Sequence, residues 1–362
     1  MSSRRPTIAD VARRAGVAPS TASVVFSGKS RVAPETQARV REAAAELGYT
    51  GPDPLAASLR RGRSGIVAVV LHGGIGSVFL DPVATVLMDG LAAALAPLGA
   101  GLLLLRTDPA DAPGGSGPTL DSVPIDAAVL LGSTRHAAVD AVRARGIPVV
   151  AIEGEAESDI PTIALDNREA EREIARHLAE FGHRDVAIVT LSLGTGDAPG
   201  WIAAGTEARI AMPVTAERLA GAREVFPDAP AYAAGLSLID EGLRAGRAIF
   251  AAGRPTAVIA QSDLLAAGVI RAAEEAGLRV PQDVSVAGFD GVAIDGIAPY
   301  RLTTMVQPAA ERGRAAGDLI AALLEGRDAP SIRFTSTFRE GNTTGPAPPG
   351  GDEAESASEP GR

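Results

Sequence analysis

The sequence predicts a chain of class α/β, with a small all-α head followed by a core of two parallel-sheet lobes. In the first 50 residues, the apolar positions follow helical spacing. From Ile66 onward, short continuous apolar runs alternate with amphipathic stretches, which is typical of buried parallel strands joined by right-handed helical crossovers. A chain of 362 residues is also long enough to form a head and two further lobes.

Residues 7–26 (TIADVARRAGVAPSTASVVF) predict two short helices joined by a glycine turn. Thr7 is a good N-cap because its hydroxyl can accept a hydrogen bond from a backbone amide, and Gly16 suits the left-handed exit of the first helix. The second helix starts near Pro19 and turns the small side chain of Ala22 inward, leaving its hydroxyl residues outside. This is the layout of a helix-turn-helix, whose second helix fits the DNA major groove; an ordinary helical hairpin is the alternative.

Two further segments extend the head. Residues 34–47 predict a third helix with one apolar face, closed by Gly48. Asp53 as N-cap and Pro54 at the first helical position predict a short helix that ends at Leu59. At about one and a half turns, this helix is too short to be stable alone in water, so we expect it to fold only when something supports it.

These segments resemble the lactose-repressor (LacI/GalR) family of transcription regulators. The resemblance is carried by the motif TIADVARRAGVAPSTAS, by the helix between Val32 and Tyr49, by the short helix ending at Leu59, and by several later blocks. It implies a helix-turn-helix head, a hinge helix and a periplasmic-binding-protein-like core of two Rossmann-like lobes. The resulting division is a head (1–50), a hinge helix and linker (51–64), an effector-binding and dimerisation core (65–343) and a disordered acidic tail (344–362).

The core is expected to contain strands and helices in alternation. The expected strands are IVAVVL, LLLLR, AAVLLG, PVVAIE, VAIVTL, AVIAQS and VSVAGF, and the expected helices are residues 83–98, 168–181, 233–252, 264–276 and 308–324. So many strands predict two lobes: lobe 1 from residues 65–164 and 291–324, and lobe 2 from residues 165–290 and 325–343. The last stretch, IRFTSTFREGNTT, is expected to cross back as an edge strand. Ligands of open parallel sheets bind beyond the carboxyl ends of the strands, so the interlobe cleft is the expected site.

By position in the family motif, the resemblance implies a set of DNA-contacting residues in the head. Pro19, Ser20 and Val24 face base edges; Thr21, Ser23, Ser27, Thr36 and Tyr49 donate to phosphates; Arg31 contacts either, and Thr7 completes the set. The base-facing positions lack a bidentate donor, so direct readout is expected to be weak. For Val24, partial packing inside the head is the alternative role.

Leu59 resembles the family's hinge leucine, which enters the minor groove at the operator centre and kinks the DNA there. Leu55 and Ala56 line the same face, against the hinge helix of the second subunit. Packing of Leu59 on the core is the alternative. Because base readout by the second helix is expected to be weak, more of the operator specificity is expected to rest on Leu59 and on DNA deformability.

The resemblance also implies a set of effector-binding residues at the cleft: Phe79, Glu153, Arg218, Tyr232, Asp263, Asp290 and Gln307. Carboxylates and an arginine beside an aromatic ring suit a sugar or another polyhydroxy compound, because they offer acceptors, donors and an apolar plane. Helix capping and lobe packing are the alternative roles of Asp263 and Asp290. The glycine-rich stretch 194–213 is a lid or an insertion, and its Trp201 either reaches the cleft or packs on the surface.

Charge is divided unevenly along the chain. Residues 1–63 carry eleven Arg or Lys against five Asp or Glu, a net charge of +6. Because the whole chain carries −10, the remainder carries −16. A basic head on an acidic body fits a phosphate-binding module attached to a body that DNA repels.

Other functional classes have weaker support. The chain has no cysteine, which excludes a disulfide framework and thiolate chemistry. Catalysis is disfavoured because no Walker lysine follows the GTGD turn and because His72, His136, His177 and His183 lack the spacing of metal ligands. A solute-binding protein shares the core architecture but needs a secretory signal and no DNA-binding head, whereas this N-terminus shows neither a signal peptide nor a membrane span.

The sequence therefore predicts a cytoplasmic transcriptional regulator, a repressor and not an enzyme, with no metal or other cofactor. It is expected to bind a pseudopalindromic double-stranded DNA operator as a homodimer and to respond to a small, sugar-like effector. Effector binding is expected to bias the hinge helix between folded and unfolded states, with either sign of coupling.

Overall fold

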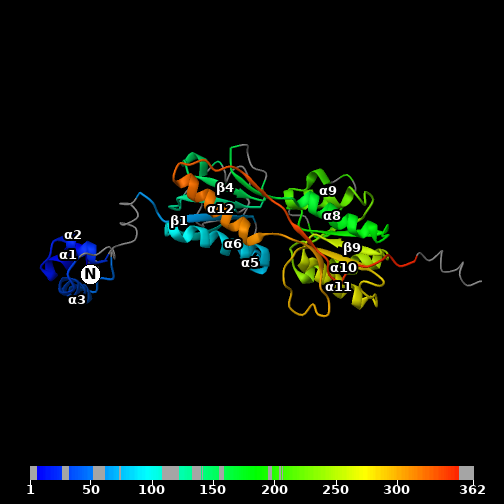
Figure 1. Cartoon of the computed structure of the whole chain (residues 1–362), viewed down its shortest axis with the longest axis horizontal. Helices are drawn as coiled ribbons and strands as arrows, with labels where there is room; N and C mark the ends of the chain where they lie inside the picture. The colour runs from blue at the N-terminus through cyan, green and yellow to red at the C-terminus, as the bar shows by residue number, and fades with distance from the viewer. Residues whose placement is uncertain are drawn as a thin grey trace, which may run out of the picture. The chain divides into compact units, whose positions relative to one another are not determined.

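A computed structural model of the chain describes residues 6–26, 32–51, 62–72, 75–107, 122–132, 140, 142–154, 159–194, 198–203, 205 and 207–349. The chain divides into two compact units, one up to Gly65 and one from Ile66 onward, and Figure 1 labels their elements. None of the described helices is long and apolar enough to span a membrane.

The N-terminal unit contains three helices, α1 (Ile8–Ala15), α2 (Pro19–Phe26) and α3 (Pro34–Leu47). Thr7 caps α1 in a capping box with Asp10, and Gly16 and Gly48 end α1 and α3 in the left-handed conformation, each with a φ of 65°. The structure thus confirms these three predicted caps, whereas the predicted cap Asp53 lies outside the described residues. The three helices bury one small cluster, Val11, Ala12, Ala22, Val25, Val40, Ala43 and Ala44. Its small alanines allow the short helices to approach one another closely.

Several predicted residues of the head and hinge lie outside the described residues. They are Ser27, Arg31, Leu55, Ala56 and Leu59. The hinge helix and its contact with the minor groove therefore stay predictions.

The first lobe of the C-terminal unit is a parallel sheet with strand order β12-β5-β4-β3-β1-β2. Its strands are β1 (Ile66–His72), β2 (Gly101–Thr107), β3 (Ala127–Leu131), β4 (Val149–Ile152), β5 (Thr162–Leu165) and β12 (Ile332–Phe334). Its helices are α5 (Ile75–Leu80), α6 (Pro82–Leu95), η1 (Ala96–Leu98) and α12 (Ala309–Leu324). Val67, Val69 and Leu71 of β1 join the cluster formed with α6 and α12, whereas Ala68 and Val70 join the cluster on the opposite face. Both faces of this sheet are therefore buried, as its continuous apolar strands predict.

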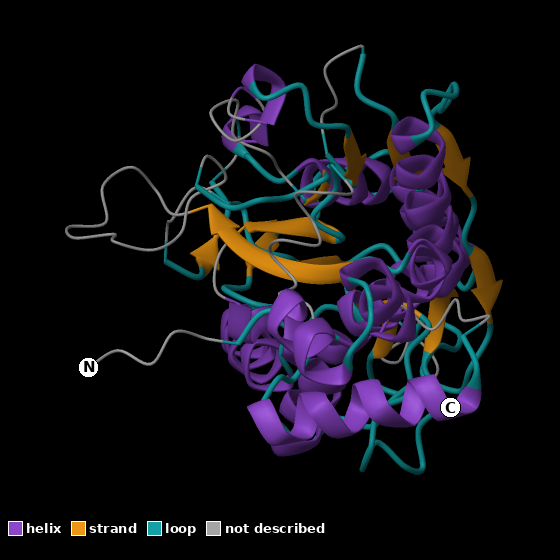
Figure 2. Cartoon of the chain, turned by 90° about the vertical axis from the view of Figure 1, so that its left-hand side faces the viewer, coloured by secondary structure: helices purple, strands orange, loops and turns teal. Residues whose placement is uncertain are grey.

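The second lobe is a sheet with strand order β13-β11-β10-β9-β6-β8-β7, in which β7 and β13 run antiparallel to their neighbours. Its strands are β6 (Val186–Thr190), β7 (Gly200–Trp201), β8 (Ala231–Ala233), β9 (Ala257–Ala260), β10 (Ser285–Asp290), β11 (Thr303–Val306) and β13 (Thr337–Arg339). Its helices are α8 (Asn167–Glu180), η2 (Glu207–Arg209), α9 (Pro213–Arg223), α10 (Ile239–Ala252) and α11 (Asp263–Glu275). α8 and α9 pack on one face, with Ile188 and Phe289, and α10 and α11 pack on the other, with Val189 and Val258. Figure 2 shows the strands of the core together with the helices that accompany them, coloured by type.

The helices of each pair cross at glycines. In lobe 1, a Cβ added at Gly313 of α12 would lie 2.0 Å from the carbonyl oxygen of Leu87, and a Cβ at Gly90 of α6 would lie 2.3 Å from that of Ala310. Only glycine lets two backbones approach this closely, so these two residues determine how closely α6 packs against α12.

The chain passes between the two lobes three times, and two of the passes differ from the predicted boundaries. The second pass follows Val306 and not residue 290, because β11 pairs in parallel with β10 of lobe 2. The third pass follows Phe334 and not residue 324, because β12 pairs with β5 of lobe 1 and only β13 pairs in lobe 2. Strands of three or four residues that contain Thr or Arg leave no apolar run to detect, which explains both differences.

The other differences lie in short segments. The predicted strands are all present, but β5, β7, β8 and β11 were not predicted, and the helix expected from residue 233 begins at Ile239. The first residues of the predicted disordered tail are bonded to lobe 2: the Gly345 carbonyl lies 3.0 Å from Nε2 of His183, and the Ala347 amide donates to the Phe181 carbonyl. Residues 350–362 lie outside the described residues.

Candidate DNA-binding face and interlobe cleft

Helix α2 has one buried and one exposed face. Ala22 and Val25 are 0% and 6% exposed, whereas Pro19, Ser20 and Ser23 are exposed. Of the other predicted contacts in α2, Thr21 and Val24 are partly buried. The face available to a partner therefore begins at the N-terminal end of α2, and Val24 lies at its border.

The remaining described residues of the predicted DNA-binding set flank this face or cap a helix. Thr36 and Tyr49 are partly buried, and the Tyr49 ring packs edge-on against Phe26 with 5.2 Å between ring centroids. The Thr7 hydroxyl donates to Asp10 over 2.7 Å. This bond orders the first turn of α1 and occupies the hydroxyl hydrogen, so a DNA contact through Thr7 remains a prediction.

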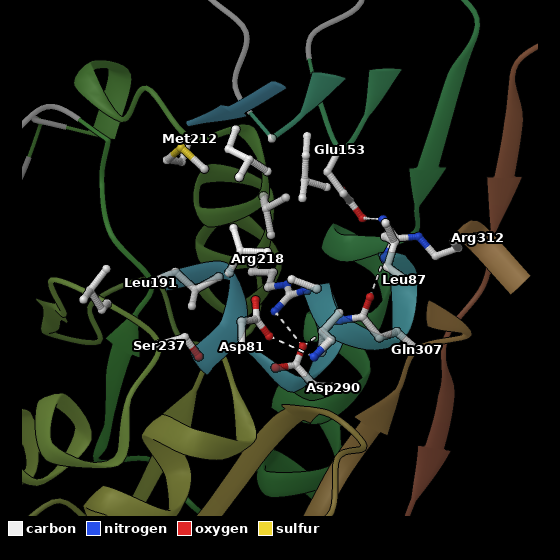
Figure 3. A pocket seen from close by; sticks show the side chains of 18 of the residues that line it. Asp81, Leu87, Glu153, Leu191, Met212, Arg218, Ser237, Asp290, Gln307 and Arg312 are labelled. Atoms are coloured by element: carbon white, nitrogen blue, oxygen red, sulfur yellow. Dashed lines mark hydrogen bonds and ion pairs between the residues drawn. The ribbon is translucent and has the colours of Figure 1, made fainter. Parts of the chain in front are cut away.

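The core contains a cavity of about 270 Å³ between the two lobes. Its polar lining residues are Asp81, Glu153, Arg218, Ser237, Asp290, Gln307 and Arg312, and its apolar lining residues are Leu71, Val78, Val83, Ala84, Leu87, Leu131, Leu191, Met212, Val214, Leu236 and Leu238. Glu153 and Asp290 stand at the carboxyl ends of β4 and β10, which is the edge at which open parallel sheets bind ligands. Figure 3 shows Glu153, Gln307 and Arg312 on the side of the cavity away from Met212 and Leu191, whereas Ser237 lies near Leu191.

On the lobe 2 side, Arg218 is the centre of the polar contacts. Its Nε donates to Asn167 over 2.9 Å, its Nη1 donates to the Gln261 carbonyl over 2.6 Å, and Nη1 lies 3.6 Å from Oδ1 of Asp290. The guanidinium also lies over the Phe289 ring, 3.5 Å from the centroid. With a side chain only 4% exposed, Arg218 is held in one position by contacts on several sides.

Lobe 1 completes a closed ring of side chains. Asn167 donates to Glu153 over 2.8 Å, and Gln307 donates to Oδ1 of Asp290 over 2.7 Å. Arg312 of α12 donates to both Gln307 and Glu153. The ring therefore runs through both lobes and through the segment between them, so that a change at one member affects its neighbours in the other lobe.

The two ring carboxylates that end strands also have unusual backbone conformations. Glu153 has a φ of 56° and Asp290 a φ of 115°, and they are the two non-glycine residues with positive φ in the described part of the chain. Positive φ at such residues persists only where the surroundings compensate for it, and it is concentrated at functional sites. Here the hydrogen bonds of the ring hold both side chains in place.

Burial sets the protonation of the carboxyls at this end of the cleft. Burial raises the pKa of Asp290 well above its ordinary value. The negative charges of Asp263 and Asp81 raise this pKa further, and the positive charge of Arg218 lowers it only in part. Burial also raises the pKa of Glu171 to about 8, and both carboxylate oxygens of Glu171 are buried without a hydrogen-bond partner. Glu171 is therefore a neutral acid beneath the cleft at pH 7.

The structure brings four of the seven predicted effector-binding residues to the cavity and leaves three away from it. Glu153, Arg218, Asp290 and Gln307 line the cavity, while Phe79, Tyr232 and Asp263 do not. Phe79 is 63% exposed on α5, and Tyr232 is a buried core residue. Asp263 begins α11 and accepts hydrogen bonds from the Thr304 hydroxyl and the Val292 amide, which is the packing role of the alternative. The cap of α11 is Ser262.

The predicted aromatic face is therefore missing from the cavity. No Phe, Tyr or Trp is among the described residues that line it. Trp201 packs edge-on against Tyr232, is 47% exposed, and borders a separate hollow with Pro230 and Pro255. Among the described residues of the 194–213 stretch, Met212 lines the cleft.

Sequence reasoning missed two charged residues of the cleft. Arg312 lies on the same helical face as Ala309, Ala316 and Ile320, and a charged residue on an apolar face is a signal that it has a buried partner. Asp81 carries no such signal, because an acid before a proline reads as an ordinary N-cap.

Two family models match the chain: bacterial regulatory proteins of the lacI family over residues 7–51, and a periplasmic binding protein-like domain over residues 175–344. An HTH-type transcriptional regulator of Mycolicibacterium smegmatis is 31% identical over 336 residues, with 88% of this chain and 90% of that protein covered. The chain belongs to the lacI family of bacterial regulatory proteins.

This lacI-family regulator is similar to further proteins over most of its length. The HTH-type transcriptional repressor CytR of Escherichia coli is 28% identical, with 89% of this chain and 90% of CytR covered. A structure of the transcriptional regulator CelR in complex with cellobiose has a TM-score of 0.65 at 26% identity, with 94% of this chain and all of that chain covered. The lac repressor dimer bound to operator and the anti-inducer ONPF has a TM-score of 0.73 at 21% identity and the same coverage, which shows the shared fold.

Proposed function

We propose that this regulator is a repressor that binds a pseudopalindromic operator as a homodimer, and that a small molecule in the interlobe cleft controls its DNA affinity. The observation that carries the proposal is the division of α2 into a buried face and an exposed face that starts at Pro19. A helix anchored in this way presents its first turns to the major groove. CytR, which is named a transcriptional repressor, supports the sign of the regulation.

Exposed apolar side chains on α5 and α6 support the homodimer. Phe79, Leu80 and Val86 are 63%, 57% and 45% exposed. A second copy of the chain that covers this face would remove the three side chains from water. Two-fold symmetry would then match the two half-sites of a pseudopalindrome. The lac repressor, which has the same fold, is a dimer on its operator.

The polar ring supports control by a ligand in the cleft. Its members come from both lobes, so a bound molecule that contacts them favours one arrangement of the lobes over another. The polar residues and the CelR–cellobiose complex support a sugar-like or related small molecule. Ligand binding then biases the hinge segment that joins the core to the head, with release or recruitment of the repressor as the two possible signs.

The proposal assigns no catalytic reaction to the chain and places it in the cytoplasm, where it meets DNA. The relatives support both points because they are named transcriptional regulators. The buried acids and arginines of the cleft bond mainly to one another, which suits binding better than proton transfer.

Selection of random double-stranded DNA tests the proposal. The full-length chain should enrich a pseudopalindrome with half-sites about one helical turn apart, and the chain without residues 1–63 should enrich no sequence. The affinity for the enriched DNA should fall as salt is added, because phosphate contacts release counterions. Equal retention of DNA by the truncated chain would instead favour a solute-binding protein, and an affinity independent of salt would exclude a phosphate-anchored head.

A further inference from the structure

The charges that line the interlobe cavity do not balance. The lining carboxylates are Asp81, Glu153 and Asp290, and the lining cations are Arg218 and Arg312. Arg312 pairs with Glu153, and Arg218 pairs with Asp290. In the described part of the chain, Asp81 has no ion-pair partner. By formal charge, the cavity lining therefore has one acidic side chain more than it has cations. Burial raises the pKa of Asp290, and a cation placed beside it would favour its ionised form.

The unpaired carboxylate faces the cavity from lobe 1. Asp81 is the N-cap of α6, where its Oδ1 accepts the amide of Val83 over 2.9 Å. Figure 3 shows its carboxylate directed toward the place where Arg218 and Asp290 meet. Desolvation raises the pKa of Asp81, and the amides of Val83 and Ala84 and the charge of Arg218 only partly oppose this. Asp81 from lobe 1 and Asp290 from lobe 2 thus share a single arginine.

The rest of the cavity wall is aliphatic. Leu71, Val78, Leu87, Leu131 and Met212 are among its apolar lining residues, and Figure 3 shows Met212 and Leu191 on the side away from Gln307 and Arg312. An aliphatic wall favours the apolar face of a compact skeleton and gives no stacking surface for an extended polar ring. The cavity thus presents a negatively charged polar side and an apolar side to the same small molecule.

We propose that the effector carries a protonated amino group that lies between Asp81 and Asp290, on a compact skeleton whose apolar face contacts the aliphatic wall. The inference rests on the proposed function, since it names the chemical class of the molecule that controls the regulator. An ammonium group has three hydrogen-bond donors and no acceptor, so it can donate to carboxylates of both lobes at once. By joining the lobes it favours their closed arrangement, which is how binding would reach the hinge.

A neutral or anionic effector fits the cavity less well. An anion would have to approach Asp81 and Asp290 with only Arg218 to compensate, which disfavours it electrostatically. A neutral polyol could accept from Arg218 and donate to the carboxylates, but it would leave the excess charge of Asp81 in place. Glu171 does not enter this count, because it is not among the residues that line the cavity.

Two matched pairs of probes test the proposal: cyclohexylamine against cyclohexanol, and glucosamine against glucose. Isothermal titration at pH 7 with the full-length protein measures each dissociation constant, and the shift in melting temperature gives an independent reading. In at least one pair, the amine should bind about tenfold or more tightly than its hydroxyl counterpart, as charge-assisted hydrogen bonds at a partly desolvated site predict.

Asp81→Asn separates charge from helix capping. Asparagine caps a helix as well as aspartate does, so the variant should fold and melt like the wild type without ligand. It should lose the preference for the amine, because the affinity for the amine should fall by much more than the affinity for the hydroxyl probe. Asp81→Ser, which also retains a capping side chain, provides a second variant. Asp89→Asn removes the same charge from an exposed position of α6 and should keep the preference.

Three results would overturn the proposal: equal or tighter binding of the hydroxyl member in both pairs, an amine preference that survives in both Asp81 variants, or no binding of any probe. All are measured without DNA. Failure here therefore leaves the DNA selection result intact, and failure of the DNA selection leaves this result intact.

Discussion

The head and the core differ in how their functional surfaces are built. The described DNA-contact candidates that are exposed lie on one short helix, α2, so their relative positions follow from helical spacing alone. The cleft combines residues as distant in sequence as Asp81, Arg218 and Arg312, which meet only when both sheets have formed. A change on α2 should therefore act locally, whereas a change in the ring should leave several buried partners unsatisfied.

Arg218→Ala should have the largest effect on stability, and it tests whether the members of the ring depend on one another. The substitution removes the partner of Asn167, of the Gln261 carbonyl and of Asp290. The free energy of unfolding of the core should fall by about 3–5 kcal/mol, as when one member of a buried charged group is removed. Urea denaturation followed by circular dichroism measures the loss.

The matched control is Arg247→Ala, which breaks the exposed pair with Glu275. That change should cost less than about 1 kcal/mol. If Arg218→Ala cost no more than the control, the ring would not contribute to the stability of the core.

Glu171→Gln should stabilise the core increasingly as the pH rises. Burial raises the pKa of Glu171 from 4.5 to about 8, so between these values the folded chain holds a proton that the unfolded chain releases. The wild type therefore loses stability relative to the glutamine variant as the pH rises through this window, by up to about 1.4 kcal/mol per pH unit. Denaturant unfolding of both proteins at pH 5, 6, 7 and 8 gives the difference, and a difference that does not change with pH would refute a buried neutral acid.

Gly313→Ala should show that the close packing of α12 on α6 requires a residue without a side chain at this position. The added methyl group would lie 2.0 Å from the Leu87 carbonyl oxygen. The two helices would have to move apart, at a cost of about 1–3 kcal/mol in unfolding free energy. Gly253→Ala is the control, since a Cβ there meets nothing within 4 Å and the backbone is extended. Equal melting temperatures of the two variants would contradict the close crossing.

Thr7→Ala should have the smallest effect and should be confined to the head. The change removes the capping box with Asp10 and should destabilise α1 by about 1 kcal/mol. DNA affinity should fall slightly while the melting temperature of the core stays the same. Thr50→Ala, at an exposed position after α3, is the control. A lower melting temperature of the core would show that the two units are not independent.

The same difference between head and core explains what could be predicted from the sequence. The caps Thr7, Gly16 and Gly48 were predictable because capping is a local property of a few adjacent residues. The continuous apolar strands were predictable because they are buried on both faces. The lobe boundaries were not, because β11 and β12 are short and their membership depends on which neighbouring strand they pair with.

The cleft was predictable only in part. Glu153 and Asp290 end strands, so the position of each at the cleft follows from the parallel fold. Asp263 also follows a strand, but its carboxylate turns to Thr304, because it begins a helix that packs on that side. Asp81 is an ordinary N-cap by sequence, and Arg312 is a charged residue on an apolar helical face. The role of each depends on partners contributed by other segments.

The most direct measurement is the affinity of a Ser20→Asp variant for the operator selected by the wild type. Ser20 lies on the exposed face of α2, so a carboxylate there would meet DNA phosphates without disturbing the buried cluster of the head. The dissociation constant should rise by at least about a hundredfold, while the melting temperature and ligand binding of the core remain those of the wild type. An unchanged operator affinity would contradict the assignment of α2 as the DNA-binding helix.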